Sequence, residues 1–489
     1  MIALRLGDRL IGVASFSILA RLLTPEDYGI VALAMSVVAI VGLAGEWGVE
    51  TAVVQRRGYD RGYYDTAWTV RVIAAAILSV LVCIVALPAS RLFAEPRIEP
   101  VLYWLAFGLV VASFENIGTV DFVKTLEYRR ELVYRLTIRV MGAILAGGLA
   151  FAWRSYWALV ASTIFAAGAK VVLSYRFHPF RPRFSLAHFS GLFKFTRWVF
   201  VRNMFQGAND HAANIILGRS VGVGQLSFFT FARELSAIVA TDFYAPTRKA
   251  LFPAYAAVNN DMATLKRLTI DSSSLMMLIG LPLSAGLGVV APDAVHVLLG
   301  DRWFPVITPL RILCVAGCVG SAIAGATVLY DAMGRPDTVA KLAALRFAVV
   351  VPLLAVGATV AGVVGAAWAM VATACVTQVF NWCVVKSRLD LSGKEIRRHF
   401  TRPVVATAIM VLAVLAVQDV LPDGGSFASS LFRLVAGIVA GGLVYVLSLV
   451  TLWRIAGKPE GAERHVLELL GVIGKRVVFW RARVTGGGS

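Results

Sequence analysis

The sequence predicts an all-α integral membrane protein with about fourteen transmembrane helices. Hydrophobic residues make up 58% of the 489-residue chain and charged residues only 16%, whereas about 25% of an average soluble domain is charged. Apolar stretches of roughly twenty residues recur along the chain, and each is long enough to cross a hydrocarbon core of ~30 Å as a helix. Most of the surface is therefore expected to face lipid.

The apolar runs, and the breakers between them, place the individual spans. Six spans form an expected N-terminal lobe over residues 1–194, six more form a C-terminal lobe over 195–385, and two fill 386–453. The first span carries charged residues and no small-residue cleavage site, so it is expected to remain as a helix. The expected spans are 2–23, 28–54, 66–87, 99–118, 133–152, 155–175, 195–217, 225–245, 268–290, 310–330, 342–359, 363–385, 403–417 and 431–453.

The distribution of basic residues predicts the orientation in the membrane. If the N-terminus is cytoplasmic, the inner gaps and the tail contain 29 Lys and Arg residues, and the outer gaps contain five. Basic residues of short loops stay on the cytoplasmic side. We therefore expect both termini of a bacterial inner-membrane protein to lie in the cytoplasm. The five outer residues are Arg91, Arg97, Arg154, Arg219 and Arg302.

A net charge of +18 could indicate a nucleic-acid partner, but most of the basic residues fall in the expected cytoplasmic gaps and tail. We therefore attribute the charge to membrane orientation and expect no nucleic-acid partner. In the basic tail, 454–489, apolar and basic residues alternate over 462–484, which is compatible with an interfacial helix on anionic lipid or with a solvated tail. Residues 486–489 resemble an appended linker. The five cysteines lie inside apolar runs, without the histidines of a metal site, so we expect no disulfide, metal or cofactor.

A weak internal repeat predicts two similarly oriented lobes. Residues 18–21 (ILAR) recur as 216–219 (ILGR), at an offset of 198 residues. The offset spans six helices, an even number, so the two copies keep the same direction in the membrane. Parallel repeats of this kind enclose a central cavity about an axis along the membrane normal.

The seventh span is the most polar and predicts a cavity lining. Its polar residues, His211 excepted, fall within a wedge of about 140° at ~100° per residue. Interhelical hydrogen bonds also use Asn and Gln, but six polar positions on one face exceed that need. These six are Arg202, Asn203, Gln206, Asn209, Asp210 and Asn214.

Other intramembrane charges are candidates for substrate and ion binding, because ionisable groups at membrane depth are costly and usually face a cavity. Arg233 is the first candidate for a phosphate contact, since a guanidinium keeps its charge and binds phosphate bidentately. The alternative is an ion pair with Asp210 or Glu234. In the first lobe, two groups of charges form either a structural latch or a phosphate-and-cation entry site. These groups are Arg5, Asp8 and Arg9 in the first span and Glu46 and Glu50 in the second.

Several stretches resemble the bacterial oligosaccharide flippases of the multidrug/oligosaccharidyl-lipid/polysaccharide exporter superfamily. They are residues 18–29 (ILARLLTPEDYG), 31–34 (VALA), 48–55 (GVETAVVQ), 126–132 (LEYRREL) and 251–254 (LFPA). The resemblance implies twelve core helices in two lobes with two further helices appended. Relatives usually carry a longer basic N-terminal segment, which suggests that the native chain starts earlier or has been trimmed.

The resemblance also implies the function. The expected substrate is an undecaprenyl-pyrophosphate-linked oligosaccharide, carried by alternating access to the periplasm for exopolysaccharide, O-antigen or capsule synthesis. Arg233, Arg202, Arg9 and Arg5 would balance the phosphates, and Asp210, Glu234, Glu46, Glu50 or Asp8 would bind a coupling ion. A polysaccharide polymerase and a chain-length regulator are further expected partners, beside membrane lipids.

Two other functions remain open at this point. A cation-coupled multidrug antiporter of the same superfamily would favour a carboxylate-dominated cavity, whereas this chain mixes in arginines. A membrane glycosyltransferase or polymerase generally needs a substantial external loop with acid and base groups, and the longest outer gap, 291–309, is short. No phosphate-binding loop of the Walker type is present, so we expect neither ATP hydrolysis nor another enzymatic activity.

Overall fold

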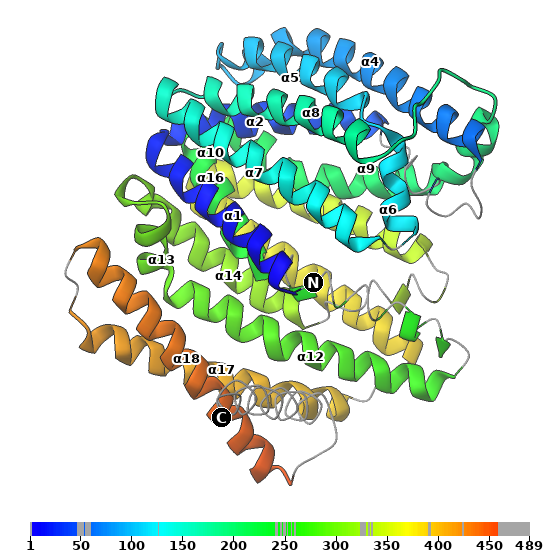
Figure 1. The fold of residues 1–489 in the computed structure, drawn as a ribbon. Coiled ribbons are helices and arrows are strands. Elements are labelled where there is room, and N and C mark those ends of the chain that lie inside the picture. The colour runs from blue at the N-terminus through cyan, green and yellow to red at the C-terminus, as the bar shows by residue number, and fades with distance from the viewer. Residues whose placement is uncertain are drawn as a thin grey trace, which may run out of the picture. The chain divides into compact units, whose positions relative to one another are not determined.

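The structure, a computed structural model, describes residues 2–457 apart from short segments. Those segments are 46–52, 54–59, 126, 240–242, 245–246, 248–250, 252, 256, 259–260, 323–328, 331–332, 334–335, 390–392 and 423–424. Side chains also lie outside the description at 2–10, 123, 128, 190–202, 239, 336–337, 388 and 393–399. All regular elements of the described residues are helices (Figure 1). The expected interfacial helix over 462–484 lies outside the described residues.

The chain folds as two compact units. The first contains residues 1–231, 298–309 and 343–369, and the second contains 232–297, 310–342 and 370–489. Helices of the first unit are α1 (Ile2–Leu22), α2 (Pro25–Gly42), η1 (Leu43–Gly45), α4 (Arg61–Leu92), α5 (Ile98–Ser113), η2 (Ile117–Val120), α6 (Asp121–Lys124), α7 (Tyr128–Trp153), α8 (Trp157–Phe177), α9 (Phe189–Ser220) and η4 (Asp301–Val306).

The second unit is built mainly from the later helices. They are α12 (Met262–Val289), α13 (Ala291–Leu298), α14 (Ile307–Ser321), α17 (Gly393–Val420) and α18 (Phe427–Ile455). The helices α10 (Val223–Val239) and α16 (Pro336–Leu389) are divided between the units, and α13 and α14 each have one end in the first unit. These units do not divide the chain at residue 194, and the expected lobe boundaries stay a prediction.

A helix lies at each predicted span, in the predicted order. Within the described ranges each of the fourteen corresponds to one long helix, except that α16 supplies both the eleventh and the twelfth. Its backbone leaves the helical region at Ala361 and Gly362, where Gly362 has a φ of 57°. The sequence placed the break between these spans at the same point, 360–362. The predicted outer gap 291–309 is not an open loop, because it contains α13 and η4.

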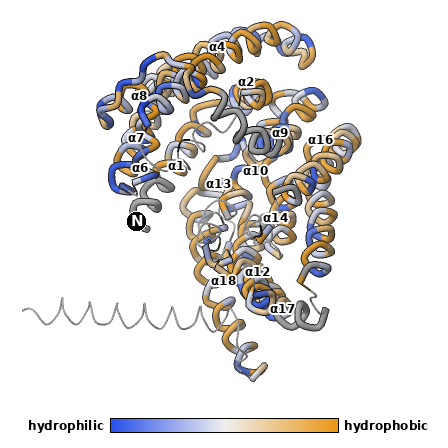
Figure 2. The backbone as a smooth tube through the Cα atoms, turned by 90° about the vertical axis from the view of Figure 1, so that its right-hand side faces the viewer, coloured by the Kyte–Doolittle hydropathy of each residue, from blue (hydrophilic) through white to orange (hydrophobic). Residues whose placement is uncertain are grey.

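The surface of the long helices is apolar, as a lipid environment requires. On α4 the exposed side chains include Ile77, Val80 and Ile84, with 56%, 59% and 63% of their surface accessible. Their spacing of three, four and seven residues puts them on one face of the helix. Figure 2 shows hydrophobic residues predominating along the helices. In the described part of the chain, nine helices are long and apolar enough to cross a membrane, and α9 and α10 are not among them.

The connection between α8 and α9 is bound to the first unit. Asp65 of α4 accepts a hydrogen bond from the backbone amide of Arg183 at 2.8 Å, and the amide of Ser185 donates to Thr69 at 3.0 Å. The side chain of Asn116 donates to the carbonyl of Phe180 at 2.7 Å. Side-chain bonds of this kind fix a segment that has no regular structure of its own. The start of α9 is thereby positioned against α4.

Candidate functional site

The polar stripe of α9 divides into an exposed and a buried set. Gln206 and Asp210, one helical turn apart, are exposed, and Asn203 is half-buried. Asn209 and Asn214 are buried. The side chain of Arg202 lies outside the described residues. The exposed set occupies one face of a helix whose length of 32 residues exceeds a bilayer crossing.

The buried amides of α9 hold neighbouring helices. Asn209 donates from Nδ2 to the carbonyl oxygens of Phe205 and Ala343, at 2.8 and 3.0 Å, and so contacts α16. Asn214 donates from Nδ2 to Oγ of Ser36 in α2, at 2.8 Å. Interhelical hydrogen bonds of this type stabilise helix pairs in membranes. In this conformation both amides serve packing, and a role for either in lining a cavity stays a prediction.

Small residues let α2 approach α9 and α10 closely. A Cβ atom on Gly29 would collide with the backbone carbonyl of Val223, at the start of α10. A Cβ on Gly218 of α9 would lie 2.7 Å from the side chain of Leu33. Backbones can meet at such distances only where a side chain is missing. We use the name α2–α9 seam for these contacts of α2 with α9 and the start of α10, which extend from Gly29 to the hydrogen-bonded pair of Ser36 and Asn214.

The turn before α2 explains much of the motif TPEDYG at 24–29. Thr24 caps α2: its Oγ1 accepts from the amide of Asp27 at 3.3 Å, and Asp27 accepts from the amide of Thr24 at 3.0 Å. This reciprocal capping box satisfies two amides at the start of the helix. Asp27 also accepts a hydrogen bond from the amide of Tyr156, at 3.0 Å, in the connection between α7 and α8. The motif thus joins two predicted outer turns.

A second outer contact involves charged groups. Arg97, before α5, contacts Glu95 at 2.7 Å and Glu26 of the α2 turn at 3.7 Å. Hydrogen bonds from Arg97 hold the pKa of the Glu95 carboxyl below its ordinary value. Arg97 therefore links the turn before α5 to the turn before α2.

Aromatic residues from four elements gather beside this turn. Trp303 of η4 is fully buried and stacks on Phe231 of α10, with ring centroids 3.9 Å apart. Its indole Nε1 donates to the carbonyl oxygen of Ala20 at 2.8 Å, one of the last four carbonyls of α1, which have no partner within the helix. Tyr28 meets Phe231 edge-on at 4.8 Å. We call Phe16, Tyr28, Phe228, Phe231 and Trp303 the outer aromatic cluster.

The outer aromatic cluster was not predicted from the sequence. Phe16 and Phe231 lie in apolar spans, where aromatic residues are ordinary, and Trp303 lies in a gap read as a loop. The one available signal was Trp303 itself, a large apolar side chain in a segment expected to be solvated. Its partners could not be inferred, since 283 residues separate it from Ala20.

The remaining candidate charges are described only in part. In α10, Arg233 is half-buried and Glu234 is exposed. Arg5, Asp8 and Arg9 lie in α1, but their side chains are outside the described residues, and Glu46 and Glu50 are wholly outside them. The structure therefore leaves both the latch and the entry site as predictions.

A buried carboxylate joins four helices near their predicted inner ends. Glu115 contacts Lys170 of α8 at 2.7 Å and Arg71 of α4 at 3.9 Å. It also accepts a hydrogen bond from the hydroxyl of Tyr134 in α7, at 2.9 Å. Arg71 additionally donates to the backbone carbonyl of Ser113, at 3.2 Å. The contacts of Glu115 therefore hold α4, α7 and α8 together.

The chain is similar to proteins of surface-polysaccharide synthesis. Residues 18–308 match the family described as "Polysaccharide biosynthesis protein". The lipopolysaccharide biosynthesis protein WzxC of Escherichia coli (strain K12) is 20% identical over 383 residues, 77% of each chain. The succinoglycan biosynthesis transport protein ExoT of Rhizobium meliloti (strain 1021) is 22% identical over 440 residues, 89% of this chain and 88% of the relative.

Solved transporter structures share the fold. The lipid II flippase MurJ, in an inward closed conformation, aligns with a TM-score of 0.75 and 12% identity over 93% of this chain and 98% of its own. An inward-facing multidrug resistance transporter of the MATE family, in the MOP superfamily, aligns with a TM-score of 0.64 and 16% identity over 78% of this chain and 94% of its own. At these identities the likeness concerns the fold, which is the one that the sequence resemblance implied.

Proposed function

The chain belongs to the polysaccharide biosynthesis protein family, and on that premise we propose that it is a flippase for undecaprenyl-pyrophosphate-linked oligosaccharides. It moves the sugar headgroup from the cytoplasmic to the periplasmic leaflet, while the prenyl chain stays in lipid. The names of its relatives, one a lipopolysaccharide biosynthesis protein and one a succinoglycan transport protein, support a substrate of this class.

One observation carries the proposal: α9 keeps polar side chains exposed within a membrane-length helix. An oligosaccharide would lose many hydrogen bonds with water in hydrocarbon, so it needs a polar route. Gln206 and Asp210 of α9 supply exposed polar groups for that route, and Glu234 of α10 supplies another. Arg233, with Arg202, Arg9 and Arg5, balances the pyrophosphate charge.

The α2–α9 seam and the outer aromatic cluster act as the outer closure in this mechanism. Both join helices of the first expected lobe, α1 and α2, to helices of the second, α9 and α10. Opening to the periplasm separates these contacts, and closing reforms them. Moving a charge through the membrane field is worth ~2.3 kcal/mol per elementary charge per 100 mV, so an inside-negative potential favours export of the anionic headgroup. Proton or cation binding at Asp210 or Glu234 then resets the carrier.

A deletion strain tests the proposal directly. Loss of the gene is expected to abolish the surface polymer and to trap lipid-linked repeat units on the cytoplasmic leaflet, where an impermeant sugar-oxidising reagent cannot reach them. The Arg233→Ala chain should reproduce the trapping at a normal membrane level, whereas Arg302→Ala, at an exposed outer position, should restore polymer. Normal polymer without a trapped intermediate in the deletion strain would overturn the proposal. A change in drug susceptibility in place of these effects would identify an antiporter.

A further inference from the structure

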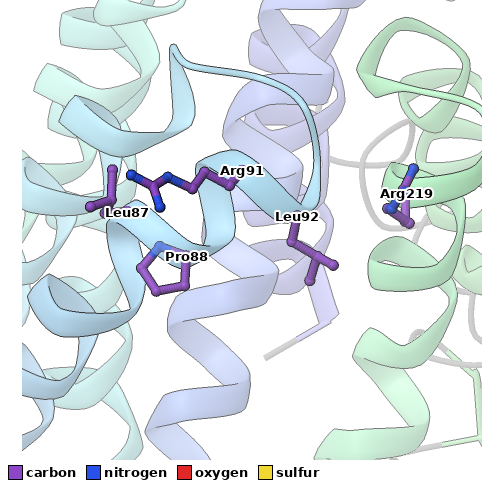
Figure 3. A pocket seen from close by; sticks show the side chains of 5 residues that line it. All are labelled: Leu87, Pro88, Arg91, Leu92 and Arg219. Carbon is purple, nitrogen blue, oxygen red and sulfur yellow. The ribbon is translucent and has the colours of Figure 1, made fainter.

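Two arginines share one pocket at the predicted outer ends of α4 and α9 (Figure 3). The pocket has a volume of about 570 Å³, within the range of ~300–1,000 Å³ that is usual for small-molecule sites. Arg91 and Arg219 line it together with Leu87, Pro88 and Leu92. Figure 3 shows the two arginine side chains on different helices, with Leu92 between them and the guanidinium of Arg91 turned toward Leu87. The lining is therefore cationic at two places and apolar elsewhere.

The two arginines have no counter-charge within the part of the chain that the structure describes. Among the described residues, neither Arg91 nor Arg219 forms an ion pair or a side-chain hydrogen bond, and both are exposed. Arg97, also on the predicted outer side, differs because Glu95 and Glu26 contact it. Two of the five arginines in the outer gaps thus line one pocket, and each guanidinium has five N–H donors to offer a ligand.

A purely structural explanation accounts for only part of this arrangement. Each arginine lies in the last turn of its helix, where a cation is stabilised by ~0.3–1 kcal/mol through the helix dipole. That effect explains why a basic residue is tolerated at either position. It does not explain why two arginines from different helices line the same pocket.

We propose that this pocket is an outer binding site for the pyrophosphate end of a prenyl-linked lipid, a step that rests on the proposed function. Arginine binds phosphate oxygens bidentately, and two guanidinium groups neutralise the two negative charges of a pyrophosphate diester. Leu87, Pro88 and Leu92 offer apolar contact to the first isoprene units. A phospholipid phosphate carries a single negative charge and would leave one arginine unneutralised. The pocket therefore receives the headgroup after it has crossed the membrane, before the lipid leaves the protein.

A fluorescent probe beside the pocket separates this site from the central route. Ser220→Cys, at an exposed position next to Arg219 that does not line the pocket, is labelled with an environment-sensitive fluorophore after the exposed cysteines at 83, 375 and 383 have been replaced by serine. The full chain also carries Arg233→Ala, which removes the proposed central phosphate contact. It is placed in nanodiscs of zwitterionic lipid and titrated with farnesyl pyrophosphate, phosphatidylglycerol or inorganic pyrophosphate.

The expected signal depends on both arginines. Farnesyl pyrophosphate should bind with an affinity that falls roughly tenfold for Arg91→Ala or Arg219→Ala and roughly a hundredfold for the double variant, as for the loss of charge-assisted hydrogen bonds. Arg154→Ala, another exposed outer arginine that does not line this pocket, serves as the matched control and should leave the affinity unchanged. Added salt should weaken binding, because the pocket is exposed.

Two results would overturn the inference. One is a double variant that binds farnesyl pyrophosphate as tightly as the parent chain. The other is phosphatidylglycerol binding with equal affinity and equal dependence on both arginines, which would make the pocket a general lipid-phosphate site. The proposed function fails separately, if the wild-type chain does not restore polymer to the deletion strain. Restored polymer together with an unresponsive probe at position 220 refutes the outer site alone.

Discussion

Replacing Trp303 tests whether the outer aromatic cluster closes the protein toward the periplasm. Trp303→Ala removes a fully buried side chain, together with its stack on Phe231 and its hydrogen bond to the carbonyl of Ala20. Large-to-small changes of this kind cost ~3–5 kcal/mol. Trp303→Phe keeps an aromatic ring but leaves the Ala20 carbonyl without its indole donor, at a cost of ~1–3 kcal/mol.

If these contacts exist only in the outward-closed state, losing them destabilises that state alone. In the absence of ligand, the equilibrium between the outward-closed and outward-open states then shifts toward the open state, by about a factor of ten for each 1.4 kcal/mol lost. We therefore expect a shift of more than about a hundredfold for Trp303→Ala and about tenfold for Trp303→Phe. The order of the two variants follows from the structure, since one loses the stack and the hydrogen bond and the other only the hydrogen bond.

Thiol labelling measures that shift. Ser17 of α1 is next to Phe16 of the cluster, and its hydroxyl has no hydrogen-bond partner among the described residues. Ser17→Cys in a chain without other cysteines should react slowly with an impermeant maleimide from the periplasmic side, and faster when Trp303 is truncated. Trp153→Ala, which removes a half-exposed tryptophan outside the cluster, is the control. If the labelling rate rises equally in both variants, or in neither, the cluster is not an outer closure.

Three further predictions concern contacts within the first unit. Gly29→Ala should lower the stability of the folded chain by ~1–3 kcal/mol, as overpacking does, because the added Cβ would collide with the carbonyl of Val223. Gly224→Ala is the control and should be close to neutral, since its Cβ would lie 3.5 Å from the nearest side chain. Thermal melting in nanodiscs compares the two variants. Glu115→Ala should cost up to about 3 kcal/mol, because it removes the buried carboxylate that pairs with the half-buried Arg71 and accepts a hydrogen bond from Tyr134, and Glu115→Gln should cost less, so equal melting temperatures would contradict the pairing. Hydrogen bonds from an arginine lower the pKa of Glu95 in the folded chain, so its contribution is complete above the ordinary glutamate pKa and is lost as pH falls through the lower folded value. Melting curves below about pH 4 should therefore be less pH-dependent for Glu95→Gln than for wild type.

The structure gives a physical reason for five of the six residues of TPEDYG, 24–29, which is part of the sequence that carried the family resemblance. Thr24 and Asp27 form the capping box, and Asp27 also binds the turn before α8. Glu26 contacts Arg97, Tyr28 enters the outer aromatic cluster, and Gly29 permits backbone contact with α10. The motif therefore stabilises the packing of helices at their predicted outer ends. The groups proposed to bind substrate lie elsewhere in the chain.

The amino-acid sequence by itself determined the membrane class, the order of the helices and their approximate ends. It could do so because the apolar length of a span and the charge of a loop are local properties, set by the thickness of the bilayer and by the sidedness of basic residues. Even the break in α16 was visible, at 360–362, since a short Gly-containing step interrupts an apolar run.

Only the tertiary structure decided which polar residues of α9 are packed and which are accessible. The helical wheel places Asn209 and Asp210 in one wedge, yet the first is buried against α16 and the second is exposed. That difference depends on the positions of neighbouring helices far away in the chain, as does the contact of Trp303 with Ala20. Periodicity assigns a residue to a face of its helix, whereas burial depends on what the fold places against that face.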